Sequence, residues 1–359
     1  PTRIDFLFEL IVGKKENKYD TLHSYRKYSA IAEAREKNEF VEKDWETVKA
    51  LYNRLVEWFD DREMYHLIGF IIYRGLSNIH EVKDLNENKG KKEFKESLRE
   101  KLKDEFNRRK DENTEEKIYN LDIDNEDLNY NNYPKEILNI LLLHNIETYQ
   151  KSEAAFRFPF DHFKKEKWSL EHIHAQNAEE LNTGKEAYEW LKDLEELFKK
   201  WQNDGKQEVS VSDKKKIKEK ITVLKHELES NKENHQEKLP DYQKSKRDEI
   251  KDLTDSFFKT HHISNLALLD RNTNSALGNR LFKEKRKKIL DIDQEEWIDK
   301  DEKIKAFVPV CTKNAFLKYY SQKIDQMEYW GYQDRNDYLN NIKETLNPYF
   351  EQKENNDEQ

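Results

Sequence analysis

Apolar residues recur at three- and four-residue intervals over most of this chain, which is the spacing of one helix face. Between residue 3 and about residue 82 the pattern includes Val48, Leu51 and Leu55, and Pro134 begins another such stretch. A highly charged stretch at 83–130 keeps a thin apolar stripe of the same spacing, formed by Phe94, Leu98, Leu102 and Phe106. We therefore expect a mainly α-helical protein.

Two short segments depart from the helical period. The stretch from residues 156–160 to Trp168, which leads into the Glu171-His172 segment, is expected to be extended, and residues 262–269 have the loose alternation of apolar and polar positions that is typical of a strand. The chain between them, at 178–260, returns to the helical period and includes a Lys-rich stretch, so we expect a helical insertion between two strands. A helix is predicted at 275–290, directly after the second strand, and helices are predicted from there to a polar tail.

Composition supports a folded protein with a small but aromatic core. Charged residues form 39% of the chain and apolar residues 35%, yet 18 Phe, 18 Tyr and 7 Trp supply large areas for burial. The 8 Gly and 6 Pro suit long helices and argue against a sandwich or barrel. Five aromatic residues on apolar stripes are expected to pack in the core, namely Trp45, Trp58, Phe59, Trp168 and Trp330.

The cysteine content and the ends of the chain suggest a cytoplasmic location. Cys311 is the only cysteine, which excludes an intrachain disulfide and suits a reducing compartment. No apolar run is long enough to span a bilayer, and no signal peptide opens the chain, so we expect no membrane association. Pro1 stands where an initiator Met is expected, which suggests a chain that begins inside a longer protein. The net charge of -9 opposes indiscriminate nucleic-acid binding but leaves room for local basic patches.

The residues with the clearest chemistry lie in and around the two predicted strands. Cleavage of a phosphodiester needs a base to activate water and a cation to stabilise negative charge. His172 can serve as the base, and Glu171 and Asn274 offer oxygen ligands suited to Mg²⁺ or Mn²⁺. Adjacent residues of a strand point to opposite faces, so Glu171 and His172 must lie at a strand end or bulge to face one phosphate.

These segments resemble the ββα-metal (His-Me finger) motif of HNH nucleases. More narrowly, Leu170-Glu171-His172-Ile173, the Asn265-Leu266 segment and Asn274 followed by Asn279 are similar to the HNH region of GmrSD-type, modification-dependent (type IV) restriction endonucleases. The resemblance implies an embedded ββα-metal motif in a mainly α-helical protein. It also implies a helical domain at 1–150 from the middle of a longer parent, a nuclease domain at 151–350 with an insertion at 178–260, and a disordered tail at 351–359.

The resemblance assigns roles to individual residues. It implies a metal-dependent endonuclease that hydrolyses DNA in the restriction of foreign or modified DNA. His172 is then the general base, Glu171 and Asn274 hold one Mg²⁺ or Mn²⁺ ion, and Asn265 fixes the loop that orients His172. Hydrogen-bonding support is expected from His174 and His262. Contacts to DNA are expected from four residues after the second strand, namely Asn279, Arg280, Lys285 and Arg286.

Several alternatives remain open at this stage. The family's usual proline three residues after the catalytic histidine is Ala175 here, and the family's nucleotide-hydrolysing signature is missing, so that half is expected to be absent or to be a partner subunit. A catalytically inactive nucleic-acid-binding or regulatory module fits the same residues, as does an RNA-directed nuclease. A cluster of His172 with His174, His261 and His262 would instead hold a transition metal. Since one such site cuts one strand, cleavage of both strands needs two events or two copies, as in a homo-oligomer.

Overall fold

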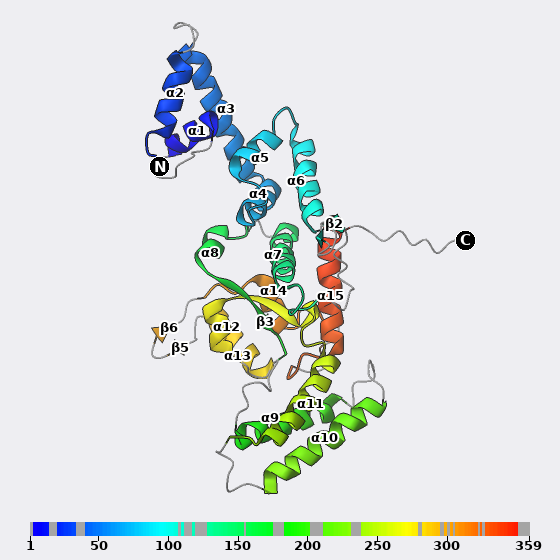
Figure 1. Cartoon of the computed structure of the whole chain (residues 1–359). Coiled ribbons are helices and arrows are strands. Elements are labelled where there is room, and N and C mark those ends of the chain that lie inside the picture. Colours follow the sequence, from blue (N-terminus) through cyan, green and yellow to red (C-terminus); the bar gives the residue numbers. More distant parts are fainter. Residues whose placement is uncertain are drawn as a thin grey trace, which may run out of the picture. The chain divides into compact units, whose positions relative to one another are not determined.

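The computed structural model divides the chain into two compact units, each assembled from separate stretches of sequence (Figure 1). Unit 1 comprises Pro1–Leu121, Ile146–Lys164 and Asn347–Gln359, and unit 2 comprises Asp122–Asn145 and Lys165–Leu346. The structure describes residues 3–13, 20–33, 40–106, 109–110, 117–118, 128–153, 156–174, 183–201, 211–230, 238–278, 282–294, 298–299, 302–303, 306–321, 324 and 327–350. The expected boundary near residue 150 falls inside a helix, and the polar tail at 351–359 lies outside the described residues.

Unit 1 consists mainly of helices. They are α1 (Arg3–Val12), α2 (His23–Glu33), α3 (Phe40–Asp60), α4 (Arg62–Tyr73), α5 (Ile79–Leu85), α6 (Lys91–Phe106), the last part of α7 (Pro134–Lys151), α8 (Phe160–Lys165) and the short 3-10 helix η3 (Asn347–Tyr349). A small antiparallel pair, β1 (Arg109–Lys110) and β2 (Lys117–Ile118), follows α6. Asp61 caps α4 by accepting a 3.0 Å hydrogen bond from the Met64 backbone N–H, which explains why α3 and α4 are separate helices.

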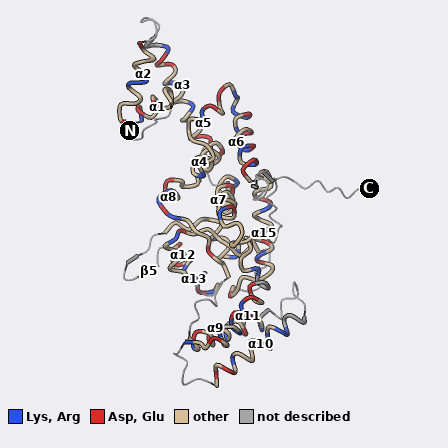
Figure 2. Tube along the Cα trace, viewed as in Figure 1, with Lys and Arg blue, Asp and Glu red and all other residues tan. Residues whose placement is uncertain are grey.

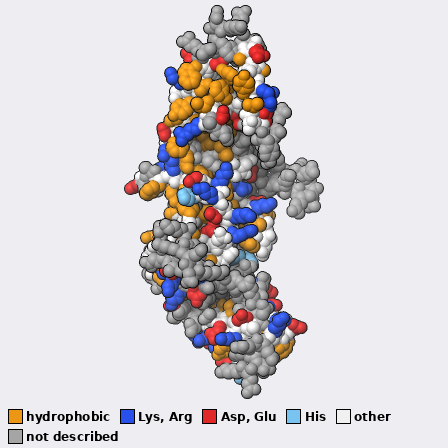
Figure 3. All heavy atoms as spheres, turned by 90° about the vertical axis from the view of Figure 1, so that its left-hand side faces the viewer, with side chains coloured by type: hydrophobic (Ala, Val, Ile, Leu, Met, Phe, Trp, Pro, Cys, Tyr) orange, Lys and Arg blue, Asp and Glu red, His pale blue; other side chains and the backbone are white. Residues whose placement is uncertain are grey.

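The apolar stripe predicted for the charged segment lies on α6, and its four residues are all buried. Two of the aromatic residues of α3 differ from expectation. Trp58 is buried, but Trp45 is 64% exposed and Phe59 is 56% exposed. The apolar face of α3 is therefore wider than the surface that the neighbouring helices cover, and the prediction of core packing for Trp45 and Phe59 is wrong. Figure 3 shows hydrophobic side chains gathered on this unit.

Unit 2 contains the two predicted strands. Its helices are the first part of α7, α9 (Gly184–Trp201), α10 (Val211–Ser230), α11 (Asp241–Phe258), α12 (Arg271–Leu277), α13 (Phe282–Asp293), α14 (Val310–Phe316) and α15 (Tyr332–Leu346), with a 3-10 turn, η2, at Ile263–Asn265. Its strands are β3 (Trp168–His172), β4 (Leu266–Asp270), β5 (Ile298–Asp299) and β6 (Glu302–Lys303). The chain as a whole is mainly helical, as the sequence predicts.

Strands β3 and β4 form an antiparallel pair in which His172 lies opposite Leu266 and Trp168 lies opposite Asp270. All five residues of β4 are buried, because helices cover this small sheet. The α14 residue Thr312 donates a 2.6 Å hydrogen bond to the Leu268 carbonyl oxygen, and the α15 residue Tyr338 donates one of 3.2 Å to the Leu266 carbonyl oxygen. Hydrogen bonds from α14 and α15 thus stabilise the sheet in addition to the backbone hydrogen bonds between β3 and β4.

The insertion between the strands has a hydrophobic core of its own. Helices α9, α10 and α11 bury one cluster that also includes Tyr329, from the segment before α15. Its members from the helices include Leu191, Phe198, Ile221, Leu224 and Ile250. Lys and Arg positions are interspersed with Asp and Glu positions along α10 and α11 (Figure 2). Within the described part of 178–260 the chain is mainly helical, and α10 and α11 lie in its Lys-rich stretch.

The region after β4 differs from the predicted continuous helix at 275–290. Helix α12 begins at Arg271, with Asp270 as its N-cap, and it ends before Gly278, whose φ of +56° lies in the left-handed region. A second helix, α13, starts at Phe282. Asn274 therefore lies in the middle of α12 rather than at a helix start.

Two further sequence expectations concern Cys311 and the membrane. Cys311 is buried and makes no disulfide, as the sequence predicts. None of the helices in the described part of the chain combines the length and the apolar character that a bilayer crossing requires.

Candidate functional site

His172 is the last residue of β3 and is almost completely buried. Its ring lies between two others, with centroid distances of 5.2 Å to Tyr130 and 5.4 Å to His261. The buried Nε2 atom of His172 has no hydrogen-bond partner among the described residues. A buried nitrogen without a partner is costly, and such atoms often mark a position that a ligand or substrate completes.

Glu171 forms an ion pair with Lys285, a residue of α13. The Lys285 Nζ atom lies 2.5 Å from Glu171 Oε1, and both side chains are buried. Lys285 Nζ also donates a 2.7 Å hydrogen bond to the His172 carbonyl oxygen, so one ammonium group holds the end of β3.

Asn274 is anchored to β3 from α12. Its Nδ2 group donates hydrogen bonds of 2.8 Å to Ser169 Oγ and 3.0 Å to the Leu170 carbonyl oxygen. These two bonds fix the plane of the amide, so the direction of its Oδ1 oxygen is fixed as well. Asn274 on α12 and Glu171 on β3 thus lie on neighbouring elements, joined by these hydrogen bonds.

Asn265 holds the loop that follows β3. Its Oδ1 accepts a 2.9 Å hydrogen bond from the His174 backbone N–H, and its Nδ2 donates one of 3.2 Å to the His174 carbonyl oxygen and one of 2.8 Å to the Thr260 carbonyl oxygen. Its backbone carbonyl oxygen accepts a further 2.9 Å bond from Ile173. Asn265 is completely buried, so every one of these bonds replaces water.

The other two predicted histidines lie close to this loop but in different roles. His262 caps the 3-10 turn η2, since its Nδ1 accepts a 3.2 Å hydrogen bond from the Ser264 backbone N–H and lies 2.9 Å from Ser264 Oγ. His174 is buried, two residues beyond His172. Ser264 is itself held at its carbonyl oxygen by the Trp330 indole N–H, at 3.1 Å. His262 therefore supports the backbone turn that leads into Asn265.

Burial sets the protonation of these groups. It lowers the pKa of His172 to about 3, and the charges of His261, Lys285 and His174 lower it further. It also lowers the pKa of His174 to about 3, with smaller contributions from Arg335 and Lys285. His172 is thus neutral at pH 7, as the sequence predicts, but it is a weaker base than a free histidine. Burial raises the pKa of Glu171, and the adjacent Lys285 ammonium opposes part of that rise.

The residues predicted to contact DNA have different locations. The prediction for Lys285 needs correction, because the side chain is only 1% exposed and its ammonium group is engaged within the protein. Arg286 is half-buried, and its buried Nε atom has no hydrogen-bond partner among the described residues. Asn279, Arg280 and Ala175 lie outside the described residues.

The sequence did not predict two features of the site, and it left the position of a third, His261, open. Tyr130 flanks His172 from a loop some 40 residues upstream, and no local pattern links the two. Lys285 is buried in an ion pair with Glu171, but in the sequence it stands among other basic residues and resembles a surface lysine. His261 directly precedes His262 in the second motif, and this place in the sequence is what suggests that it lies near His172. Its buried Nδ1 atom has no hydrogen-bond partner in the described part of the chain.

The donor atoms at the site can be compared with the requirements of Mg²⁺ or Mn²⁺. The Glu171 carboxylate and the Asn274 amide oxygen are hard donors of the type these ions prefer. The Glu171 charge is already balanced by Lys285, so a divalent ion there would have to share the carboxylate with the ammonium or displace it. No group of three or more His, Cys, Asp or Glu side chains forms a ready metal cluster within the described ranges. The donor set thus fits an oxygen-bound ion that would leave part of its coordination sphere to water and substrate.

Strands β3 and β4 and helix α12 are the elements that position the candidate site. They are a strand ending in His172, a second strand entered through Asn265, and a helix that contains Asn274. No family model, no curated protein and no solved structure matches this chain.

Proposed function

We propose that this protein is a metal-dependent endonuclease of the HNH (ββα-metal) type, which hydrolyses DNA phosphodiester bonds in the restriction of foreign or modified DNA. The observation that supports this best is the buried, neutral His172 at the end of β3, whose Nε2 has no partner among the described residues. Asn274 is hydrogen-bonded to β3, and Asn265 is hydrogen-bonded to the loop that follows β3. The proposal thus rests on His172, Asn265 and Asn274, which lie on β3, on the turn before β4 and on α12.

The reaction would begin with His172. Its neutral Nε2 atom would accept a proton from a water molecule that attacks the phosphorus. The negative charge of a bound phosphate would raise the pKa of the imidazole by stabilising its charged form, which offsets part of the effect of burial. Because strand alternation sends the Glu171 and His172 side chains to opposite faces, a phosphate served by both must lie beyond the end of β3.

The other residues would orient the reacting groups. Asn265 would keep the loop at His174, and hence the His172 ring, in place. Glu171 and Asn274 would hold one Mg²⁺ or Mn²⁺ ion, which when bound stabilises negative charge on the phosphate and the leaving group. Half-buried Arg286, whose buried Nε has no hydrogen-bond partner among the described residues, would bind a phosphate oxygen.

Plasmid nicking tests the proposal. The full chain should convert supercoiled plasmid to nicked circles with Mg²⁺ or Mn²⁺ and fail to do so in EDTA. His172→Ala should lower the rate by roughly 10²- to 10⁴-fold, whereas His162→Ala, at an exposed histidine, should not change it. Equal rates for His172→Ala and the unaltered chain would disprove the proposal. Parallel reactions on modified DNA, unmodified DNA and RNA would identify the substrate.

The Glu171–Lys285 ion pair favours a second candidate function. With its carboxylate neutralised internally, the site would belong to a catalytically inactive module that binds nucleic acid or regulates a partner subunit. Salt-sensitive DNA binding without any metal-dependent nicking would support this alternative.

A further inference from the structure

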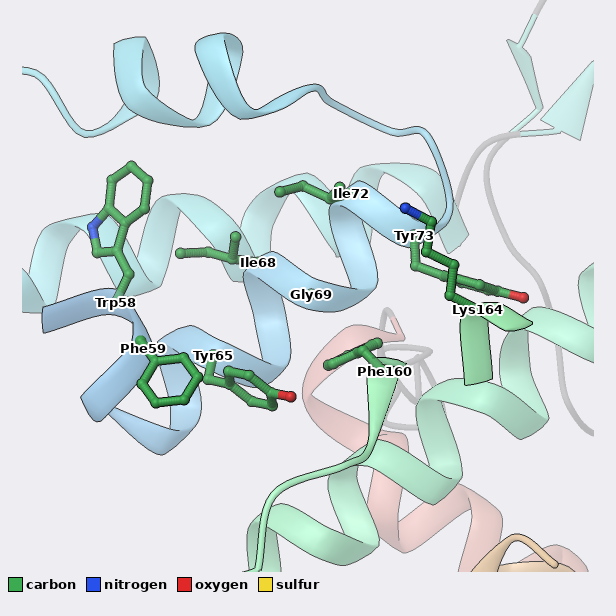
Figure 4. A pocket seen from close by; sticks show the side chains of 9 residues that line it. All are labelled: Trp58, Phe59, Tyr65, Ile68, Gly69, Ile72, Tyr73, Phe160 and Lys164. Atoms are coloured by element: carbon green, nitrogen blue, oxygen red, sulfur yellow. The ribbon is translucent and has the colours of Figure 1, made fainter. Parts of the chain in front are cut away.

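A cavity of about 480 Å³ lies among α3, α4 and α8 within unit 1 (Figure 4). Most of its lining is aromatic, from Trp58, Phe59, Tyr65, Tyr73 and Phe160. The remaining lining comes from Ile68, Gly69, Ile72 and Lys164. Its volume falls within the roughly 300–1,000 Å³ that is typical of ligand sites. None of these residues belongs to the nuclease site proposed above.

The walls of the cavity are fixed by packing and by one hydrogen bond. Gly69 lets the Phe160 ring lie directly against the α4 backbone, and a methyl group at residue 69 would overlap that ring. The Tyr65 hydroxyl donates a 3.0 Å hydrogen bond to the Phe158 carbonyl oxygen, and the Tyr65 ring lies edge-on to Phe160 at 5.6 Å between centroids. The cavity is therefore preformed, so a ligand would pay little to order it.

One aromatic wall remains open to solvent. Phe59 is 56% exposed although it lines the cavity, and Ile72 is 40% exposed. In Figure 4 the Phe59 and Tyr65 rings lie next to each other at one end, and Tyr73 and Lys164 lie at the other. Large apolar groups exposed around a preformed hollow are typical of a binding surface.

Two cationic side chains lie at the cavity. Lys164 is exposed, and the Arg157 guanidinium lies 4.8 Å from the centre of the Phe59 ring. Burial is the main reason that the pKa of Tyr65 is raised, with Asp161 adding to the rise and Arg157 opposing it. These two cations, one at each end of the cavity, can each bind a negative group of a ligand.

We propose that this cavity binds an unstacked base of a nucleic-acid strand, with the phosphates on either side of that base next to Arg157 at one end of the cavity and Lys164 at the other. The proposal rests on the proposed function, because it takes nucleic acid as the substrate. Aromatic side chains bind bases of any sequence by stacking on their flat faces, and cations at the rim bind the backbone. An aliphatic ligand would fill the same volume but would use neither the ring faces nor the two cations.

A binding assay in EDTA tests this inference without interference from cleavage. The full chain with His172→Ala is titrated against a short labelled single-stranded DNA, and against the same strand in which the bases are replaced by abasic sites. The strand with bases should bind roughly 5- to 150-fold more tightly, the range expected for stacking of one base on aromatic side chains. Phe59→Ala should remove most of that preference, and Gly69→Ala should reduce it by moving Phe160 into the cavity.

Matched variants separate the cavity from general effects on the surface. Tyr52→Ala removes another exposed aromatic residue of α3 outside the cavity and should keep the preference for bases. Lys164→Gln should weaken the binding of both DNA strands and reduce the salt dependence of that binding. Lys165→Gln, at the next exposed lysine, should have less effect. Thermal unfolding of each variant confirms that it is folded.

Three results would overturn the inference. They are equal binding of the two strands, a preference for bases that survives both Phe59→Ala and Gly69→Ala, and binding of a free deoxynucleoside monophosphate as tight as that of the strand. The last result would assign the cavity to free nucleotides. Metal-dependent nicking without a preference for bases would remove only this inference, and base-dependent binding without nicking would remove only the nuclease proposal.

Discussion

The Lys285 ammonium lies 2.5 Å from the Glu171 carboxylate, and both side chains are buried between β3 and α13. The same ammonium donates a hydrogen bond to the His172 carbonyl oxygen. One cation from α13 therefore balances the buried acid of the candidate site and holds the strand that ends in its histidine. This relationship decides how the site responds to mutation and to metal.

Removal of Lys285 should destabilise the protein. Lys285→Met leaves the Glu171 carboxylate buried without its partner, which typically costs about 3–5 kcal/mol in the free energy of unfolding. The double variant Glu171→Gln/Lys285→Met should recover much of that loss, because no buried charge remains. Urea unfolding curves of the two variants measure both effects.

Lys287→Met is the control for this prediction, since Lys287 is an exposed lysine of the same helix. It should change the free energy of unfolding by less than about 0.5 kcal/mol. A Lys285→Met variant as stable as Lys287→Met would show that the ion pair contributes nothing.

Asn265→Ala should loosen the loop after β3. The variant leaves the buried N–H and carbonyl groups of His174 without their partners, at about 1–3 kcal/mol for each unsatisfied group. Hydrogen exchange at the His174 amide should become faster by more than the change in global stability explains. Asn340→Ala, at an exposed position of α15, is the control; unchanged exchange at His174 in Asn265→Ala would contradict the assignment.

Stability should fall as the pH is lowered below about 6.5. His172 and His174 both have pKa values lowered to about 3, so between pH 6.5 and pH 3 the unfolded chain binds protons that the folded chain does not. Each histidine should therefore contribute a loss of about 2 kcal/mol between pH 7 and pH 5. Glu171 has the opposite slope near its own raised pKa.

The measurement for this prediction is the free energy of unfolding against pH. His174→Gln should flatten the curve between pH 5 and pH 7, because one of the two buried imidazoles is gone. His162→Gln, at an exposed histidine, should leave the curve unchanged. A curve of equal slope in His174→Gln would mean that His174 is not held neutral by burial.

Asp270→Ala should weaken the start of α12. The Asp270 carboxylate accepts hydrogen bonds of 3.0 Å from the Asn272 N–H and 2.9 Å from the Thr273 N–H. Loss of an N-cap of this kind typically costs about 0.5–2 kcal/mol, whereas Asp270→Ser keeps a capping oxygen and should cost less. Hydrogen exchange at the Asn272 and Thr273 amides distinguishes the two variants, and equal exchange in both would disprove the capping role.

The sequence predicted the two strands because their apolar residues repeat at a period that differs from that of the flanking helices. The structure places β3 at Trp168–His172 and β4 at Leu266–Asp270, but Phe160–Lys165, within the stretch predicted to be extended, forms the helix α8. The break between α12 and α13 was missed, because the basic residues after Asn274 keep a helical spacing. Gly278, at a φ of +56°, was the available signal for that break.

The sequence alone identifies which residue types form the candidate site, but it does not predict which side chains surround them. The acid, the histidine and the two asparagines form a local pattern, and local patterns predict which atoms are chemically suited to a metal or a proton. The burial of Lys285, the Tyr130 ring against His172 and the exposure of Phe59 depend on contacts between residues far apart in the chain. Such contacts determine the local dielectric and the pKa of each group, and only the tertiary structure sets them.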